Sequence, residues 1–292
     1  MHEFHLVYEF KSMNTHNETC SYFQISMYKD NISIFHAIGL IFISVSLLTN
    51  TVAILGTWKI NSSCKSRSLK LLVCNFGIYF LLSVNIALVF TYPYLNRSIK
   101  KTFINAHLST IILFVLLGSC FQGITAIDRY LIVRRGKKYT CWKNTFAGVI
   151  VTSLVVSLIF SLYIGYLWQR GSCKQIYSAI LLHGCTVILS LLVSSIFNVL
   201  LIRYTIKHLS DMQYSGSVLK MKIRKTLIII SSVSVVFEGT YIILTCLFAL
   251  SSISLTAKFF ILGSLYLVTL LKCAIYPFIY TIRNYDIARN VF

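Results

Sequence analysis

The residues of this chain that could do chemistry are charged side chains inside otherwise apolar stretches. Only 8 of the 292 residues are Asp or Glu, and one of them, Glu238, stands in a long apolar run, as does Lys272. A charge at the centre of a membrane span costs roughly 2.5–3.5 kcal/mol on translocon scales, so such residues usually pair or line a cavity. We therefore hypothesise an ion pair between Glu238 and Lys272. The alternative is a protonated Glu238, or one that faces a polar neighbour.

Catalytic chemistry finds no support in the remaining residues. The chain has no His-x-x-x-His spacing for a metal, no glycine-rich phosphate loop and no nucleophile elbow. We expect no enzymatic activity, no catalytic residue, no metal site and no cofactor.

The elements that must position these charges are membrane-spanning helices. The chain is 57% hydrophobic and only 12% charged, whereas soluble domains are about 25% charged. A helix needs about 20 apolar residues to cross the hydrocarbon. Seven stretches qualify: residues 34–58, 69–92, 103–127, 145–168, 176–204, 226–250 and 259–280.

These stretches predict an all-α membrane protein, a seven-transmembrane helix bundle followed by a short C-terminal amphipathic helix. We divide the chain into an extracellular N-terminal segment (1–32), a seven-transmembrane domain (33–281) and a short cytoplasmic tail helix (282–292). The first 30 residues hold no long apolar run, so we expect no cleavable signal peptide and targeting by the first span.

The net charge of +19 has a topological explanation. If the N-terminus is outside, the cytoplasmic segments carry 18 Lys and Arg and the opposite side carries 8. This excess sets the orientation as N-terminus out and C-terminus in. Basic inner loops also attract the anionic lipid of the inner leaflet. We expect the lipid bilayer as a partner, and no nucleic acid.

The predicted outer face carries sites of modification. Asn17, Asn31 and Asn96 begin glycosylation sequons. Of the nine cysteines, only Cys20 and Cys173 face outward, where thiols can oxidise. A disulfide between these two, a pair of free thiols, or an intermolecular bridge are the alternatives.

Two short motifs stand at the cytoplasmic ends of spans. Asp128-Arg129-Tyr130 closes the third, and Tyr276-Pro277-Phe278-Ile279-Tyr280 closes the seventh. Arg129 is always charged and presents a rigid fork of donors, so it can hold neighbouring helices together and release them to meet a partner. The alternative is an ordinary arginine whose side chain extends to the membrane surface.

With Asn50 on the first span and Asn75-Phe76-Gly77 on the second, these motifs resemble rhodopsin-like (class A) G protein-coupled receptors over essentially the whole chain past Asn31. The resemblance implies a plasma-membrane receptor that binds an extracellular ligand and activates a heterotrimeric G protein. The residues that it assigns to coupling and activation are Asp128, Arg129, Tyr130, Tyr276, Pro277 and Tyr280.

The chain also departs from the family pattern. Phe80 and Tyr276 replace the two residues of the family's sodium site, and Ile104 replaces the third-span cysteine of its usual disulfide. Family members often latch the arginine to an acid at the base of the sixth span, but residues 222–225 read Lys-Ile-Arg-Lys. We therefore expect a weak inactive-state latch and raised basal signalling.

The resemblance also implies a ligand pocket. Its lining would be His107, Ile111, Ile112, Val115, Tyr241, Leu244, Thr245, Phe248 and Tyr266. Ile111 stands where amine receptors carry aspartate, so a monoamine is disfavoured and a small or lipid-like ligand is favoured. The alternative is that these side chains are plain helix packing.

Two other functions remain open. One is a non-signalling seven-helix membrane protein that acts as a receptor partner or decoy, and the other is a small transporter or channel. Homo- or hetero-dimerisation is open as well.

Overall fold

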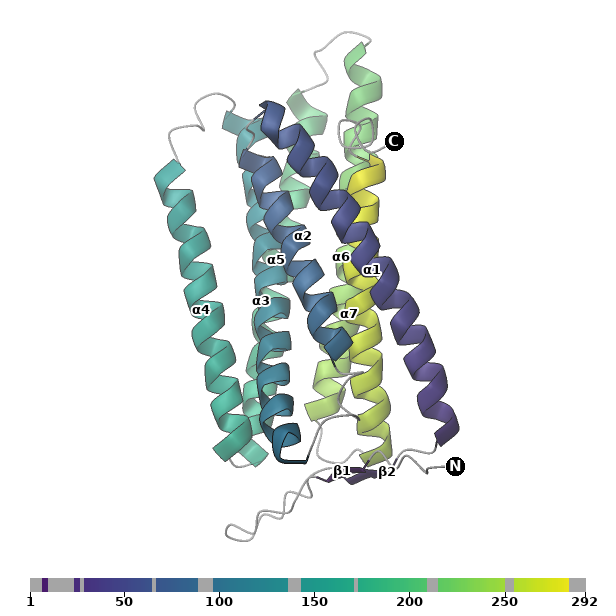
Figure 1. Ribbon diagram of the computed structural model, residues 1–292. Coiled ribbons are helices and arrows are strands. Elements are labelled where there is room, and N and C mark those ends of the chain that lie inside the picture. The colour runs from purple at the N-terminus through teal and green to yellow at the C-terminus, as the bar shows by residue number, and fades with distance from the viewer. Residues whose placement is uncertain are drawn as a thin grey trace.

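The computed structural model describes residues 7–9, 24–26, 29–64, 67–88, 97–135, 143–170, 173–208, 215–249 and 255–283. They form a bundle of seven long helices with a small hairpin at one end (Figure 1). The helices are α1 (Lys29–Cys64), α2 (Arg67–Ala87), α3 (Arg97–Arg135), α4 (Lys143–Arg170), α5 (Cys173–His208), α6 (Ser215–Ala249) and α7 (Leu255–Arg283).

All seven helices contain a stretch long and apolar enough to cross a membrane, which confirms the predicted seven-helix bundle. Large apolar side chains on the outer faces remain exposed, such as Leu55 at 65% and Ile159 at 62%. Apolar faces of this kind suit a lipid solvent. The helical backbone suits it as well, because each helix satisfies its own backbone hydrogen bonds.

The sequence did not predict the hairpin. Its strands β1 (Val7–Glu9) and β2 (Gln24–Ser26) pair antiparallel, with Tyr8 opposite Ile25. It lies at the end of the bundle where α1 begins, which we call the hairpin end (Figure 1). We call the opposite end, where α3 and α7 finish, the Arg129 end. The predicted tail helix lies outside the described residues beyond Arg283.

Helices α1, α2, α3, α5, α6 and α7 contact one another in that order, and α7 closes the ring against α1. Helix α4 packs mainly against α3. Helix α3 is central: it contacts α2, α4 and α5, and 67% of its membrane span is buried, against 17% of the α4 span. Residues on α3 are therefore the ones most able to connect the other helices.

Polar side chains join α1 to α2 and α7. Asn50, fully buried, donates from Nδ2 to the backbone oxygens of Ser46 (2.8 Å) and Cys273 (2.9 Å). The hydroxyls of Ser46 and Ser83 are 2.7 Å apart. Because a polar group buried away from water must find a partner inside the protein, these contacts fix the faces that α1 turns to its neighbours.

Small residues bring α4 close to α3. Ser161 donates to the backbone oxygen of Ser109, and a Cβ added at Gly165, one turn further on, would collide with the Ser109 side chain. Small residues four apart commonly allow close helix approach in membranes. We expect Gly165→Val to lower the unfolding free energy by about 1–3 kcal/mol, as overpacking does. Thermal unfolding in detergent measures this.

Gly148, on the same helix, is the matched control. It is exposed, and an added Cβ there meets nothing within 4 Å. Equal losses for Gly148→Val and Gly165→Val would mean that helix propensity, rather than close packing, explains the effect.

Candidate functional site

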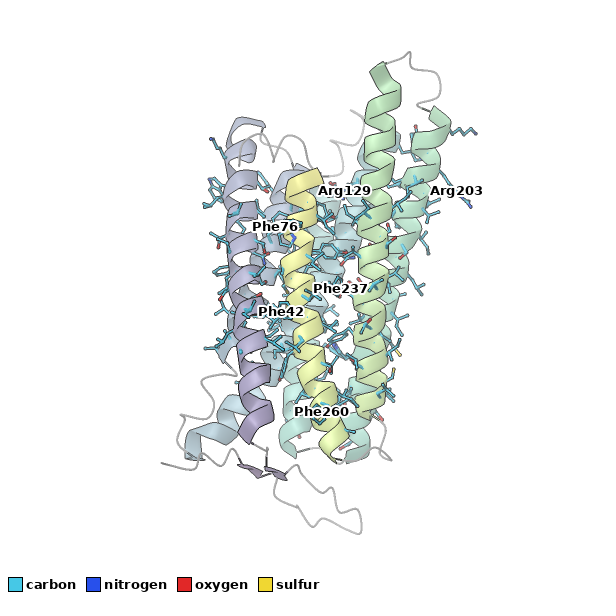
Figure 2. All side chains as sticks on the ribbon, turned by 90° about the vertical axis from the view of Figure 1, so that its right-hand side faces the viewer. Phe42, Phe76, Arg129, Arg203, Phe237 and Phe260 are labelled. Atoms are coloured by element: carbon cyan, nitrogen blue, oxygen red, sulfur yellow. The ribbon has the colours of Figure 1, made fainter. Side chains whose placement is uncertain are left out.

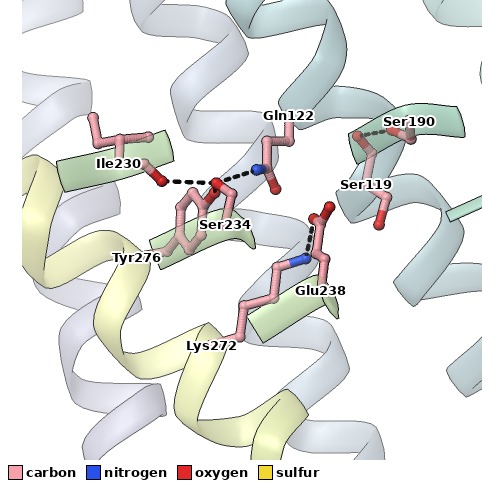
Figure 3. A network of polar contacts seen from close by, with 8 residues as sticks. All are labelled: Ser119, Gln122, Ser190, Ile230, Ser234, Glu238, Lys272 and Tyr276. Carbon is pink, nitrogen blue, oxygen red and sulfur yellow. Dashed lines mark hydrogen bonds and ion pairs between the residues drawn. The ribbon is translucent and has the colours of Figure 1, made fainter. Parts of the chain in front are cut away.

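The centre of the bundle holds an ion pair between α6 and α7. Lys272 donates from Nζ to Oε1 of Glu238 at 2.7 Å, and the two side chains are 12% and 3% exposed (Figure 3). The predicted pairing is therefore present. Removing one partner of a buried pair leaves an uncompensated charge, so this contact ties α6 to α7.

Two tyrosines surround the ammonium group. The Nζ atom of Lys272 lies 5.8 Å from the ring centroid of Tyr79 on α2 and 6.0 Å from that of Tyr276 on α7. The two rings are 5.8 Å apart. Aromatic faces attract a cation, more strongly where water is excluded, so α2 joins α6 and α7 around the charge.

A serine connects three helices one turn from the ion pair. Ser234 on α6 donates from Oγ to the backbone oxygen of Ile230 at 2.8 Å. The same oxygen accepts a hydrogen bond from Nε2 of Gln122 on α3 at 2.6 Å and pairs with the hydroxyl of Tyr276 on α7 (Figure 3). Ser234 is 1% exposed, so these bonds stabilise a contact between α3, α6 and α7.

We expect Ser234→Ala to destabilise the bundle by about 1–3 kcal/mol, because it leaves the buried Gln122 amide and Tyr276 hydroxyl without this partner. Thermal unfolding of the purified protein measures the loss. Ser232→Ala removes an exposed hydroxyl from the same helix and is expected to change little. A loss that is the same in both variants would show that the buried hydrogen bonds contribute nothing specific.

The Arg129 end carries both predicted motifs. The guanidinium carbon of Arg129 lies 4.7 Å from the ring centroid of Tyr280, so α3 contacts α7 at this end (Figure 2). The Tyr280 ring is 6.0 Å from that of Tyr276, which in turn reaches Ser234. Among the side chains that the structure describes, Arg129 makes no ion pair.

The neighbours of Arg129 point to other helices. Tyr130 packs its ring 5.6 Å from Phe197 on α5 and accepts a hydrogen bond from Arg134 at 3.0 Å. Asp128 is fully buried. Pro277, also fully buried, lies within α7, which continues through it. In the receptor family that the sequence resembles, an acid at the base of the sixth span often latches the arginine. The side chains of the corresponding residues 222–225 lie outside the described part.

These residues form one continuous polar column along the bundle axis. It consists of Glu238, Lys272, Tyr276, Ser234, Gln122, Tyr280 and Arg129. The column links the middle of the membrane span to the Arg129 end through α3, α6 and α7, so a movement of the ion pair would change contacts next to Arg129.

A small cavity adjoins the ion pair. The cavity volume that the centre of a water-sized molecule can reach is about 20 Å³. For comparison, a cavity needs about 10–15 Å³ to hold one water. Its lining is Tyr79, Leu82, Val115, Ser119, Val187, Phe237, Glu238, Tyr241, Val268, Thr269, Lys272 and Cys273. The cavity is therefore mainly apolar, with its charges at one place.

Only Val115 and Tyr241 of the nine predicted pocket residues line this cavity. His107 lies nearer the hairpin end, 3.1 Å from Oδ1 of Asn85 and with its ring 6.3 Å from that of Tyr266. Ile111 and Ile112 pack in the main core.

The other predicted pocket residues lie on α6. Thr245 donates to the backbone oxygen of Tyr241 at 2.8 Å, Phe248 packs against Ile180, and Leu244 is half-buried. The structure thus brings part of the predicted set to the cavity and packs the rest between helices.

The predicted modification sites fall where the structure describes no side chains. Asn17, Cys20 and Asn96 lie outside the described residues, as do the side chains of Asn31 and Cys173. The disulfide and the glycosylation sites stay predictions. Within the described residues no three His, Cys, Asp or Glu side chains cluster as metal ligands would.

Several site residues were missed from the sequence: Tyr79, Ser119, Gln122, Ser234 and His183 on α5, whose Nε2 lies 2.9 Å from the hydroxyl of Tyr241. Spacing offered one signal. Ser234, Glu238 and Tyr241 are four and three positions apart, which places three polar groups on one face of a helix. Ser119 and Gln122 are three positions apart on α3 and so offered the same signal.

No protein-family model and no curated protein sequence matches the chain. The classification therefore rests on the helices themselves. The chain is a multi-pass membrane protein of the seven-helix kind. Within this seven-helix protein, the polar column and its cavity are the candidate functional site.

Proposed function

We propose that this seven-helix protein is a divergent rhodopsin-like G protein-coupled receptor of the plasma membrane, with its N-terminus extracellular. It would bind an extracellular ligand on the hairpin side and activate a heterotrimeric G protein on the side of Arg129. The observation that carries the proposal is the contact between Arg129 and Tyr280. The two most specific family motifs, far apart in the sequence, meet at one end of the bundle.

The polar column supplies a route between the two sides. A ligand near the cavity would change the contact between α6 and α7, where Glu238 and Lys272 join them. Tyr276 and Ser234 carry that change toward Tyr280. A ligand shifts such an equilibrium only by its difference in affinity for the two states, so the closed bundle and an open one must differ around the cavity.

The inactive state in this proposal is held by an aromatic contact. A cation–π contact contributes about 0.5–2 kcal/mol, which is less than a buried ion pair. The ring of Tyr280 would therefore cover Arg129 without locking it. This supports the expectation of raised basal signalling and of an Arg129 side chain that a G protein can reach.

The test is G protein activation without ligand, measured for the wild-type chain, an Arg129→Ala variant and mock-transfected cells. Activity that depends on Arg129 would establish a signalling receptor. No activity above mock would contradict raised basal signalling and favour the alternative of a non-signalling receptor partner or decoy.

A further inference from the structure

The cavity beside the ion pair has unused hydrogen-bonding capacity. In the described part of the chain, the hydrogen bonds of the pair use one oxygen of Glu238 and one hydrogen of Lys272. Tyr79 and Ser119 also line the cavity, and within the described residues their hydroxyls have no hydrogen-bond partner, although the two residues are 1% and 2% exposed. Leaving a buried polar group unpaired costs about 1–3 kcal/mol, so a molecule that satisfies these groups would bind favourably.

The size of the cavity limits what enters its polar end. The whole cavity offers about 20 Å³ to the centre of a water-sized molecule, so it holds at most a hydroxyl group and a short apolar chain. Most of the remaining lining is apolar, namely Leu82, Val115, Val187, Phe237 and Val268, and the hydroxyls of Tyr241 and Thr269 are already hydrogen-bonded to His183 and to the backbone of Leu265. A polar head of one heavy atom on an apolar body fits this arrangement.

The charge of the site limits the ligand further. Glu238 and Lys272 neutralise each other at 2.7 Å. An added ammonium would compete with Lys272 for the carboxylate, and an added carboxylate would compete with Glu238. Either would leave a buried charge without its partner, which is strongly unfavourable. The head group is therefore uncharged.

We propose that the cavity formed by Glu238, Lys272, Tyr79 and Ser119 binds the hydroxyl group of an uncharged, otherwise apolar molecule. A hydroxyl has one hydrogen to donate and two lone pairs that accept. It can donate to the carboxylate of Glu238 and accept from the ammonium of Lys272, which Figure 3 shows as a pair. Its second lone pair can accept from the hydroxyl of Tyr79 or of Ser119. A ketone can only accept and satisfies half of the site. This names the ligand class for the proposed receptor, and in that sense it builds on the proposed function.

Binding is tested on the purified full chain in detergent, with no G protein present. The probes are 1-propanol, 1-butanol, 1-pentanol, 2-butanone, butylamine, butanoate and pentane at equal concentration near pH 7, and the readout is the Tm. At least one alcohol is expected to raise the Tm by about 2–4 °C, as binding to the folded state does. The ketone should raise it less, and the amine, the carboxylate and pentane should not raise it.

Two variants locate the effect. Tyr79→Phe and Ser119→Ala each remove one hydroxyl from a residue that lines the cavity, and each is expected to reduce the shift. The matched controls, Tyr163→Phe and Ser232→Ala, change exposed side chains on α4 and α6 and should keep the full shift. If either cavity variant folds poorly, the other still decides the result.

Three results would overturn the proposal: no alcohol stabilises the wild type, the charged probes stabilise it as well as the alcohols, or both cavity variants keep the full shift. None of these depends on signalling. Alcohol binding without Arg129-dependent G protein activation would overturn the proposed function alone.

Discussion

Reversing the charge of either Glu238 or Lys272 is expected to remove most of the protein from the cell surface, whereas reversing both is expected to restore much of it. Each single reversal places two like charges where an ion pair of 2.7 Å now stands. Breaking a buried pair from one side costs about 3–5 kcal/mol, a large part of the roughly 5–15 kcal/mol that holds a native protein together. Surface labelling of an N-terminally tagged chain, normalised to total protein, measures the effect.

Neutral variants separate the ion pair from its alternatives. If Glu238 were protonated, Glu238→Gln alone would express like the wild type, because the amide keeps a similar shape. If the pair is charged, Glu238→Gln alone is expected to lower surface expression. The double variant Glu238→Gln with Lys272→Gln is then expected to reach the surface better than Glu238→Gln alone. Val236→Ala, at an exposed position on α6, is the control for substitution in this helix. A double reversal that expresses no better than either single reversal would exclude the pairing.

Replacing Arg129 by alanine is expected to abolish G protein activation without ligand at matched surface levels. Arg129 is the charged group at the Arg129 end that lies inside the bundle against Tyr280. The variant removes both that contact and the donors proposed to meet the G protein. We expect activity to fall at least about tenfold, which corresponds to about 1.4 kcal/mol. Second-messenger levels or nucleotide exchange measure it.

Two further variants make this result specific. Arg129→Lys keeps the charge but loses the flat guanidinium that lies over the ring, so an intermediate activity is expected. Arg203→Ala removes an exposed basic side chain from α5 near the same end and should leave activity unchanged (Figure 2). Activity above mock that is equal in Arg129→Ala and wild type would remove Arg129 from the mechanism.

The sequence predicted the parts of the site that depend on composition. Glu238 and Lys272 stood out because charges are costly inside a membrane, and their pairing was expected because the sixth and seventh spans are neighbours in the family that the sequence resembles. The contact between Arg129 and Tyr280 joins two motifs that were identified from their places at the ends of spans. The ligand pocket was predicted less well, because only Val115 and Tyr241 reach the cavity.

The sequence alone determined the number and the order of the membrane-crossing helices, because length and hydropathy decide whether a segment can cross a membrane. The helices themselves extend beyond the predicted spans, as α3 (Arg97–Arg135) does beyond residues 103–127. Only the tertiary structure decided which polar groups meet. Helices that are apolar on nearly every side carry little pattern that marks an inward face, so the rotation of each helix is set by packing against its neighbours. That packing brings Gln122, Ser234 and Tyr276 together from three helices, and it places Tyr79 and Ser119 beside the ion pair.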